Sequence, residues 1–370
     1  MKRTISIKLK VKSTQDTGKL LALKDAFTSA CNQVVPFAME NRCWNRVALH
    51  NFCYTEVRKK SSLGSQMVCN AIFATCKAYK NRNINKSEEM PKIQFRKNSS
   101  VHFDKRTYSI KGNVLSLYTL EGRIKVEMKM GEFQQKYFSE GIPKEAELIC
   151  RKGKWYFNLV LDLPDPELGQ GQTMLGVDLG ENNVVAMSSG KLVNGGEIRY
   201  RKDQYLGIRR RLQSNGSQSA RQLLKRISGK EARWMRHVNH QLSNETIKEA
   251  NKIGANVLIL EDLKNIRQRI RGSKRMRTRL HRWSFAQFQT LLEYKAQAHG
   301  LGVMYINPAY TSQTCSSCGY LGERHRHRFT CNCGNQRHSD LNASRTLCRF
   351  ALSADRATCA VNRTHVAAKR

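Results

Sequence analysis

The sequence is poor in acids and prolines and has no long apolar run. It contains 29 acidic residues against 65 Lys and Arg among 370, which gives a formal net charge of +36. Because such self-repulsion opposes compaction, we expect a polyanionic partner that neutralises it. No apolar run comes near the roughly 18 residues that a membrane-spanning helix needs. The composition therefore argues against an integral membrane protein and favours nucleic acid over a membrane as the partner.

A secretory signal is also missing near Met1. The first residues, MKRTISIKLKVK, alternate apolar and charged side chains, which is typical of a β-strand and not of a signal-peptide core. The twelve cysteines form no disulfide framework, because six are scattered over residues 1–150 and four crowd between Cys315 and Cys333. That crowding is typical of a metal site in a reducing compartment. We therefore expect a cytoplasmic protein.

The first 165 residues combine strand and helix patterns. Residues 1–14 alternate and predict one strand, residues 15–90 have helical spacing interrupted at Pro36, and residues 91–165 return to short alternating strands. Gly and charged residues separate these strands, which is typical of a small β-barrel. We predict a barrel that begins with residues 1–14 and carries the helical residues 15–90 as an insertion.

A linker and an α/β domain follow. Residues 164–172, PDPELGQGQ, hold two of the six prolines, and the pattern then changes to buried strands alternating with basic helices. We predict an α/β core over residues 172–310, a cysteine-rich insertion over 311–337 and a returning helix over 338–350. Residues 351–370 show no periodicity and predict a disordered tail.

The cysteine-rich insertion has the spacing of a zinc ribbon. Cys315 and Cys318 form a C-x2-C pair, whereas Cys331 and Cys333 form a tighter C-x-C pair. Four thiolates satisfy a closed tetrahedral structural zinc site, and the segment has too little apolar content to fold without metal. Three nearby side chains could replace a displaced thiolate: His325, His327 and His338. The alternative is four reduced cysteines in a polar loop.

Three carboxylates stand at the ends of expected elements. Asp178 ends an apolar strand in GVDLG, Glu261 ends VLILE, and Asp340 stands in HSDLNAS where a helix should start. Two-metal phosphodiester cleavage needs carboxylates that converge from different elements, and strand-end acids in α/β sheets occupy the crevice where such sites form. Alone, each could be a turn residue, a solvated strand edge or a helix cap. Their order is that expected of a ribonuclease H-like nuclease.

Four motifs, in sequence order, carry a resemblance to a known family. GVDLG, LILEDLKNIR, AYTSQTCSSCG and HSDLNAS resemble the TnpB proteins of bacterial transposons and their relatives, the small type V CRISPR effectors. The resemblance is strong over residues 174–347, and over the first 165 residues it rests on organisation. The chain departs from the family pattern at the C-x-C pair and at HSD, where many members have His-Arg-Asp.

This resemblance implies a fold, an activity and a set of cofactors. The fold is a ribonuclease H-like (RuvC) α/β nuclease domain with an inserted zinc ribbon, preceded by a wedge β-barrel that carries a helical recognition lobe. The activity is RNA-guided cleavage of double-stranded DNA next to a short flanking motif, in a bacterial cytoplasm and at the nucleoid when bound. The family's catalytic acids fall on Asp178, Glu261 and Asp340, which would hold two Mg²⁺. One structural Zn²⁺ and a guide RNA complete the cofactors.

Basic runs predict where nucleic acid binds. Residues 264–282 contain nine Lys or Arg and no acid, and residues 199–213 are similarly basic. A charge run is usually a solvated face, but here it would leave many charges unpaired, which favours phosphate contacts. The candidate contact residues are Arg209, Arg210, Arg211, Arg233, Arg269, Arg271, Lys274, Arg275, Arg277 and Arg279.

In the helical lobe, Gln66 and Asn70 stand four residues apart, on one face of a helix. The surrounding SLGSQMVCNAIFATCKAYK resembles the family helix that reads the flanking DNA motif, and amides can pair bidentately with adenine. The alternative is plain surface polarity. Two rival functions stay open for the whole chain: an RNA-guided repressor that does not cut, and a guide-free structure-specific nuclease or transposase. The three intact acids weigh against the repressor.

Overall fold

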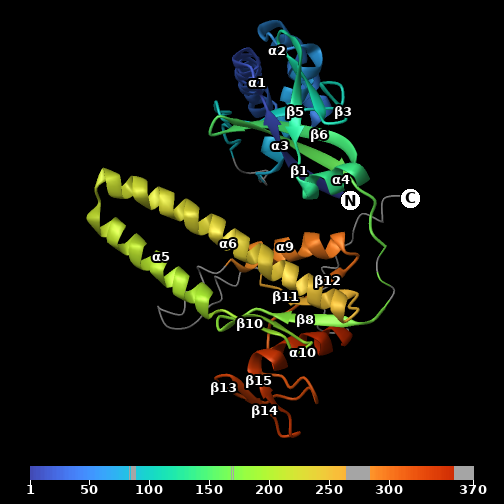
Figure 1. The fold of residues 1–370 in the computed structure, drawn as a ribbon, viewed down its shortest axis with the longest axis vertical. Helices are drawn as coiled ribbons and strands as arrows, with labels where there is room; N and C mark the ends of the chain where they lie inside the picture. The colour runs from blue at the N-terminus through green and yellow to red at the C-terminus, as the bar shows by residue number, and fades with distance from the viewer. Residues whose placement is uncertain (83, 85–88, 168, 170, 264–283, 354–370) are drawn as a thin grey trace. The chain divides into compact units, whose positions relative to one another are not determined.

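A computed structural model describes residues 1–82, 84, 89–167, 169, 171–263 and 284–353. The chain divides into two compact units, Met1–Pro164 and Asp165–Arg370, each with its own core (Figure 1). Among the helices of the described ranges, none is long and apolar enough to cross a membrane. The predicted disordered tail, apart from its first three residues, lies outside the described residues.

The first unit contains a seven-stranded antiparallel sheet in the order β2-β6-β7-β1-β5-β4-β3. The central strand β1 (Lys2–Lys10) pairs with β7 (Lys154–Asp162) and β5 (Gly122–Lys129). The remaining elements of the sheet region are β2 (Val101–Phe103), β3 (Tyr108–Lys111), β4 (Val114–Thr119), α4 (Glu132–Glu140) and β6 (Ile142–Arg151). Alternate residues of β1 and β7 are buried, as period-two patterning predicts.

The sheet differs from the predicted barrel at its edges. A closed barrel needs a hydrogen-bonded ladder between its first and last strands. Here the order ends at β2 and β3, and no pairing joins these two within the described strands. Both edges are short, with three and four residues, which leaves little backbone to form that ladder. The strands therefore form an open sheet.

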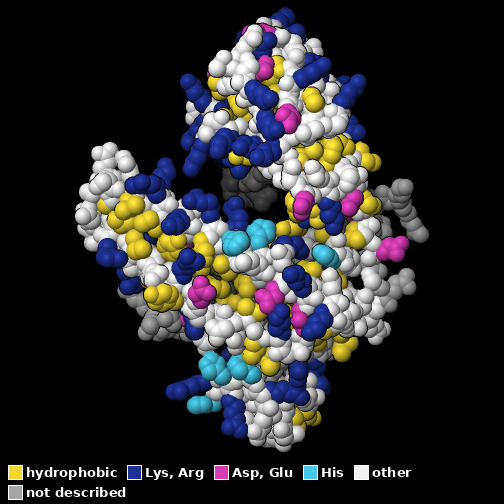
Figure 2. All heavy atoms as spheres, viewed as in Figure 1, with side chains coloured by type: hydrophobic (Ala, Val, Ile, Leu, Met, Phe, Trp, Pro, Cys, Tyr) yellow, Lys and Arg dark blue, Asp and Glu magenta, His cyan; other side chains and the backbone are white. Residues whose placement is uncertain are grey.

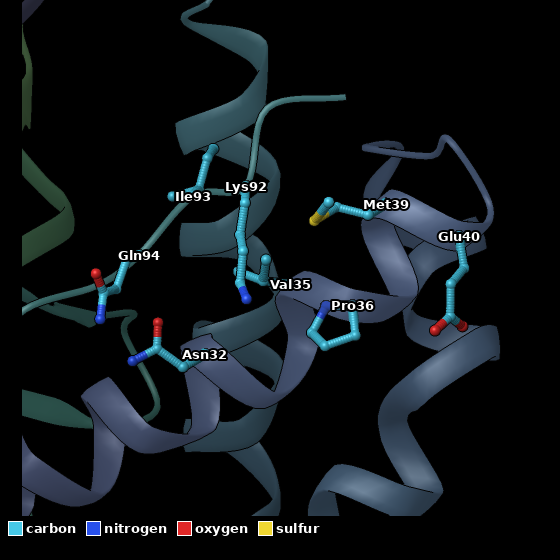
Figure 3. Close-up of a pocket in the computed structure, with 8 residues that line it drawn as sticks. All are labelled: Asn32, Val35, Pro36, Met39, Glu40, Lys92, Ile93 and Gln94. Carbon is cyan, nitrogen blue, oxygen red and sulfur yellow. The ribbon is translucent and has the colours of Figure 1, made fainter. Parts of the chain in front are cut away.

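Among the described residues between β1 and β2, the chain forms three helices: α1 (Thr14–Glu40), α2 (Arg46–Lys60) and α3 (Ser65–Lys80). The Ser13 hydroxyl caps α1. Pro36 lies inside α1 without ending it, contrary to the predicted interruption. Beside Pro36, a hollow of about 680 Å³ separates α1 from the extended residues 92–94 (Figure 3). Its walls mix apolar side chains such as Val35 and Met39 with polar ones.

The second unit is built on a five-stranded sheet in the order β10-β9-β8-β11-β12. Its strands are β8 (Met174–Asp178), β9 (Asn183–Met187), β10 (Leu192–Asn194), β11 (Val257–Glu261) and β12 (Gly302–Ile306). Strands β8, β11 and β12 are parallel, whereas β8–β9 and β9–β10 are antiparallel. A parallel centre with antiparallel strands at one side agrees with the predicted α/β core.

Helices cover both faces of this sheet. Leu258 and Leu260 of β11 belong to a core with residues of α6 (Gln218–Lys252) and α9 (Phe285–Ala298). Ile259, which points the other way, packs with residues of α10 (Ser339–Leu352). Burial on both sides explains why the sequence of β11 is continuously apolar.

A long helical hairpin extends from this sheet (Figure 1). It consists of α5 (Gly196–Asn215) and the 35-residue α6, which contact each other. Most of the buried residues of α6 lie in its C-terminal half, between Met235 and Ala250, next to β11 in the sequence. In contrast, α5 has one buried residue, Lys202. The outer part of the hairpin is therefore held mainly by its own two helices.

Between β12 and α10 the chain forms a small three-stranded antiparallel sheet. Its strands are β13 (Glu323–His325), β14 (Arg328–Thr330) and β15 (Gln336–His338). Phe329 is fully buried beneath it, while His side chains gather on its visible face (Figure 2). We refer to residues 311–338 as the ribbon.

Candidate active site and zinc ribbon

The three predicted acids meet at one edge of the five-stranded sheet. Asp178 is the last residue of β8 and Glu261 is the last residue of β11. These strands are parallel neighbours, with Val177 opposite Leu260, so both carboxylates emerge at the same edge. Asp340 lies in the first turn of α10, which packs against β8.

A close approach of helix to strand brings Asp340 to this edge. A Cβ atom on Gly176 of β8 would lie 1.9 Å from the backbone oxygen of Ser344 in α10. Only a glycine permits that distance, because a real Cβ atom cannot come within 3.0 Å of backbone. A Cβ atom on Gly180 would lie 3.9 Å from Asp340 Oδ2, so the turn after β8 also borders the acid.

The acids repel one another electrostatically. Burial, then the charges of Glu261 and Asp340, hold the pKa of Asp178 well above its usual range, although Arg324 opposes the shift. Burial also raises the pKa of Glu261. Carboxylates crowded in this way are hard oxygen ligands with excess negative charge, a donor set that fits divalent cations such as Mg²⁺.

Neighbouring side chains fix two of the carboxylates. The Thr311 hydroxyl donates to Glu261 Oε1 at 2.5 Å. Asp340 accepts from the Asn183 amide at Oδ2 (2.9 Å) and from Arg324 at Oδ1 (3.0 Å). Sequence analysis did not single out these three partners. Asn183 and Thr311 stand within or beside the recognised motifs, but their contacts join segments far apart in sequence.

The four predicted cysteine ligands come together in the ribbon. Their Sγ atoms all lie within 4.8 Å of one another, in a group that could hold a metal ion. The Cys315–Cys333 and Cys318–Cys331 sulfur distances are 3.7 and 3.5 Å. These are close to the separation of about 3.8 Å that a tetrahedron with Zn–S of about 2.3 Å requires. The tight C-x-C pair therefore does not prevent a four-sulfur site.

Local hydrogen bonds prepare one of these sulfurs for metal. Burial alone would raise the pKa of the Cys315 thiol. The pKa is instead lowered to about 6 by hydrogen bonds from the backbone of Cys318, the amide of Asn335 and the backbone of Ser317. A thiolate at neutral pH is the form that binds metal. The His338 ring instead accepts a hydrogen bond from the Asp340 backbone N–H, as the N-cap of α10.

The predicted DNA-reading amides occupy different environments. Asn70 is 1 % exposed, and its amide lies within hydrogen-bonding distance of Asp104 and Thr107. It is buried in this structure and cannot present its amide to a base, which corrects the prediction for this residue. The Gln66 amide donates to Asp104 Oδ2 at 2.6 Å, and its oxygen accepts from the exposed Arg106.

The predicted phosphate contacts divide into three groups. Arg209 pairs with Glu231 at 2.9 Å, which links α5 to α6. Arg210, Arg211 and Arg233 are exposed on the same hairpin. The other six candidates, Arg269, Arg271, Lys274, Arg275, Arg277 and Arg279, lie outside the described residues.

Comparisons with known proteins find relatives for the α/β unit and for the cysteine-rich ribbon. Residues 158–267 match the family model of a probable transposase, OrfB_IS605, and residues 285–347 match the Cas12f1-like TNB domain. The chain is 28% identical over 230 residues to the TnpB-like protein MJ0751 of Methanocaldococcus jannaschii, covering 57% of this chain and 81% of that protein. The chain is therefore similar both to TnpB-like proteins and, through its last third, to Cas12f1 effectors.

Relatives named as nucleases cover part of the chain. It is 31% identical over 218 residues to the CRISPR-associated endodeoxyribonuclease Cas12f1 of Syntrophomonas palmitatica and 30% identical over 220 residues to that of Sulfoacidibacillus thermotolerans. Each match covers 53% of this chain, but only 41% and 50% of the respective relatives. The chain thus spans about half the length of these Cas12f1 proteins.

One solved structure shows the same fold. It is a Cas12f1 chain in a complex with sgRNA and target DNA, with a TM-score of 0.65 and 15% sequence identity. The likeness covers 91% of this chain and 83% of the other. The fold of Cas12f effectors therefore applies to both units of this chain.

Proposed function

We propose that the chain is an RNA-guided, Mg²⁺-dependent endonuclease that cuts double-stranded DNA next to a short flanking motif. Residues 172–310 and 338–350 would form its RuvC-like nuclease core, and the cysteine-rich insertion at 311–337 would bind zinc. Residues 1–165 would form the wedge domain and, at 15–90, the recognition lobe. It would act in the cytoplasm, at the nucleoid when bound to DNA.

The observation that carries this proposal is the meeting of Asp178, Glu261 and Asp340 at one sheet edge. Divalent ions held there would activate a water and stabilise the leaving oxygen of a phosphodiester. Asp178 interacts with both other acids and is therefore suited to be a shared ligand. Thr311 would orient Glu261, and Asn183 would orient Asp340.

The cysteine cluster supports a structural role for Zn²⁺ in the ribbon. Four thiolates would fill the coordination shell and leave no open position for substrate. Asn335 contacts both Cys315 Sγ and Asn342 Oδ1, so the sulfur cluster is tied to the helix that carries Asp340. The metal would thereby stabilise the part of the ribbon that borders the acids.

Charge supports guide RNA and target DNA as the partners. Lys and Arg exceed acids by 36, and Figure 2 shows them spread over the visible faces of both units with few Asp and Glu between. Phosphate contacts release counterions, so binding should weaken steeply as salt rises. The solved structural relative contains sgRNA and target DNA, which fits the same pair of partners here.

The flanking motif would be read beside α3 by the surface pair Gln66 and Arg106. Arg106 is exposed and donates to Gln66 Oε1 at 3.2 Å. Asp104 accepts from both Gln66 and Asn70, which fixes the amide that Arg106 contacts. A guanidinium and an amide held side by side can pair with base edges in the major groove.

A direct test begins with the RNA. The protein, expressed with its native flanking DNA, is purified through high salt and the RNA that stays bound is sequenced. One RNA species with a fixed scaffold and a variable end is expected, and it defines a target for a Mg²⁺ cleavage assay. Guided binding without cutting would instead support the repressor. Cutting without a bound RNA would support a guide-free nuclease or transposase.

A further inference from the structure

An arginine from the ribbon reaches the acidic centre. Arg324 belongs to β13, and its Nη2 donates to Asp340 Oδ1 at 3.0 Å. The Asp340 side chain is 8% exposed and that of Arg324 is 38% exposed, so the carboxylate lies inward and the guanidinium covers it from the solvent side. Its positive charge also acts on Asp178.

The backbone of the ribbon holds this arginine in place. Arg324 Nε donates to the carbonyl of Arg326 in the β13–β14 turn. The same carbonyl accepts from the Ser339 hydroxyl, and the Ser339 backbone N–H donates to the carbonyl of His327 at 2.8 Å. Ser339 immediately precedes Asp340. The turn is therefore docked on the start of α10, next to the acid that Arg324 contacts.

The contact occupies an atom that a metal would also need. Of the two Asp340 oxygens, Oδ2 accepts from the Asn183 amide, and Oδ1 accepts from Arg324 at 3.0 Å and from the neutral Ser339 hydroxyl at 3.4 Å. Asn183 is neutral and only orients its oxygen, whereas Arg324 brings a full charge. A cation that coordinates Oδ1 must share this atom with the Arg324 guanidinium or displace it. The guanidinium and the cation therefore compete for the same oxygen.

We propose that Arg324 is a positioning residue that holds Asp340 and competes with divalent cations for its Oδ1 atom. The ribbon thereby sets how tightly the acidic centre binds its ions. The inference rests on the proposed function in one respect: it takes the three acids to be the cation site. A plain exposed ion pair, in contrast, contributes little and would leave cation binding unchanged.

The test is Mn²⁺ binding measured by calorimetry on the full-length, zinc-loaded protein freed of nucleic acid. Mn²⁺ takes the same oxygen ligands as Mg²⁺, while thiolates favour zinc. Arg324→Gln should bind Mn²⁺ more tightly, by on the order of tenfold, because one opposing unit charge is removed at hydrogen-bond distance. Arg324→Lys, which keeps the charge, should stay close to wild type.

Arg328→Gln serves as the matched control. Arg328 lies on the neighbouring strand β14, and its guanidinium donates to Gln336 Oε1 at 2.7 Å. Its replacement should leave Mn²⁺ affinity as in wild type. Unchanged or weaker Mn²⁺ binding in Arg324→Gln, in a variant that keeps one zinc per chain and its melting temperature, would overturn the proposal.

A further variant separates this inference from the proposed function. Asp340→Asn should lose most Mn²⁺ binding if the acids are the cation site. If wild type and Asp340→Asn bind Mn²⁺ equally, the cation site and the competition at Asp340 both fail. If Asp340→Asn loses binding while Arg324→Gln matches wild type, only the role of Arg324 is overturned.

Discussion

The hydroxyl of Thr311 donates a hydrogen bond to Oε1 of Glu261 at 2.5 Å. It joins the start of the ribbon to the end of β11, fifty residues earlier in the chain. The same hydroxyl lies 3.1 Å from the carbonyl of Pro308. One side chain therefore fixes the orientation of a candidate catalytic carboxylate and the course of the chain into the ribbon.

Thr311→Val keeps the shape of the side chain and removes this hydrogen bond. A hydrogen bond to a charged group contributes about 1.5–3 kcal/mol, so we expect guided DNA cleavage to slow by roughly tenfold to a hundredfold. Thr311→Ser retains the hydroxyl and should cut at a rate near wild type. Single-turnover cleavage with saturating guide and Mg²⁺ measures the effect. Equal rates for the valine and serine variants would contradict it.

Gly176→Ala should destabilise the second unit. The added Cβ would meet the Ser344 backbone oxygen at 1.9 Å, so α10 must move away from β8. Overpacking of this kind costs about 1–3 kcal/mol of unfolding free energy, and the displacement of Asp340 should also reduce cleavage. Thermal unfolding monitored by circular dichroism measures the loss.

Gly207→Ala is the control for that substitution. Gly207 lies in α5, and nothing stands within 4 Å of its added Cβ. Because alanine favours a helix interior over glycine, this variant should gain about 0.5–1 kcal/mol. A loss of stability in Gly207→Ala equal to that of Gly176→Ala would show that the close helix–strand approach is not the cause.

The acids could be predicted from sequence because each follows a local pattern. Asp178 and Glu261 end apolar runs of strand length, and parallel strands bring such ends to one edge. Arg324 and Thr311 could not be found in this way. Their roles depend on the ribbon folding back onto β11 and α10, a contact that no periodicity encodes. The prediction for Asn70 was wrong because helical spacing alone does not show which face of a helix is buried.

The open sheet of the first unit has a related explanation. Alternation along β1 and β7 predicted strands correctly, because it reflects which side chains face the core. Whether the first and last strands of a sheet meet depends on strand length, twist and shear. β2 and β3 are too short for the pattern to carry that information.

Asp178→Asn should separate cutting from stability. The variant loses a central carboxylate, so guided cleavage should stop while RNA and target DNA binding stay near wild type. Its charge no longer opposes Glu261 and Asp340, so in Mg²⁺-free buffer at pH 7.5 its melting temperature should exceed that of wild type. Millimolar Mg²⁺ should reduce this gain by stabilising wild type alone. A lower melting temperature in Mg²⁺-free buffer would contradict the repulsion.

Cys315→Ser should abolish the proposed zinc binding and, with it, the proposed DNA cleavage. Cys315 lies in the sulfur cluster, and its neighbour Asn335 also contacts Asn342 of α10. Without metal the ribbon has little core of its own, so residues 311–338 should become sensitive to protease. Elemental analysis should give one zinc per chain in wild type and less in the variant. Cys150→Ser, outside the cluster, should keep both zinc and cleavage.

Asn70 and Arg106 should respond to truncation in opposite ways. Arg106 is exposed, so Arg106→Ala should leave the melting temperature unchanged while cleavage next to the correct flanking motif falls. Asn70→Ala removes a buried hydrogen-bond partner from Asp104 and Thr107, which should cost about 1–3 kcal/mol of unfolding free energy. Cleavage of a panel of targets that differ only in the flanking motif distinguishes the two roles. The opposite result would be an Asn70→Ala variant with unchanged stability and an altered motif preference, together with an Arg106→Ala variant that cuts like wild type. That result would show that Asn70, and not Arg106, reads the bases.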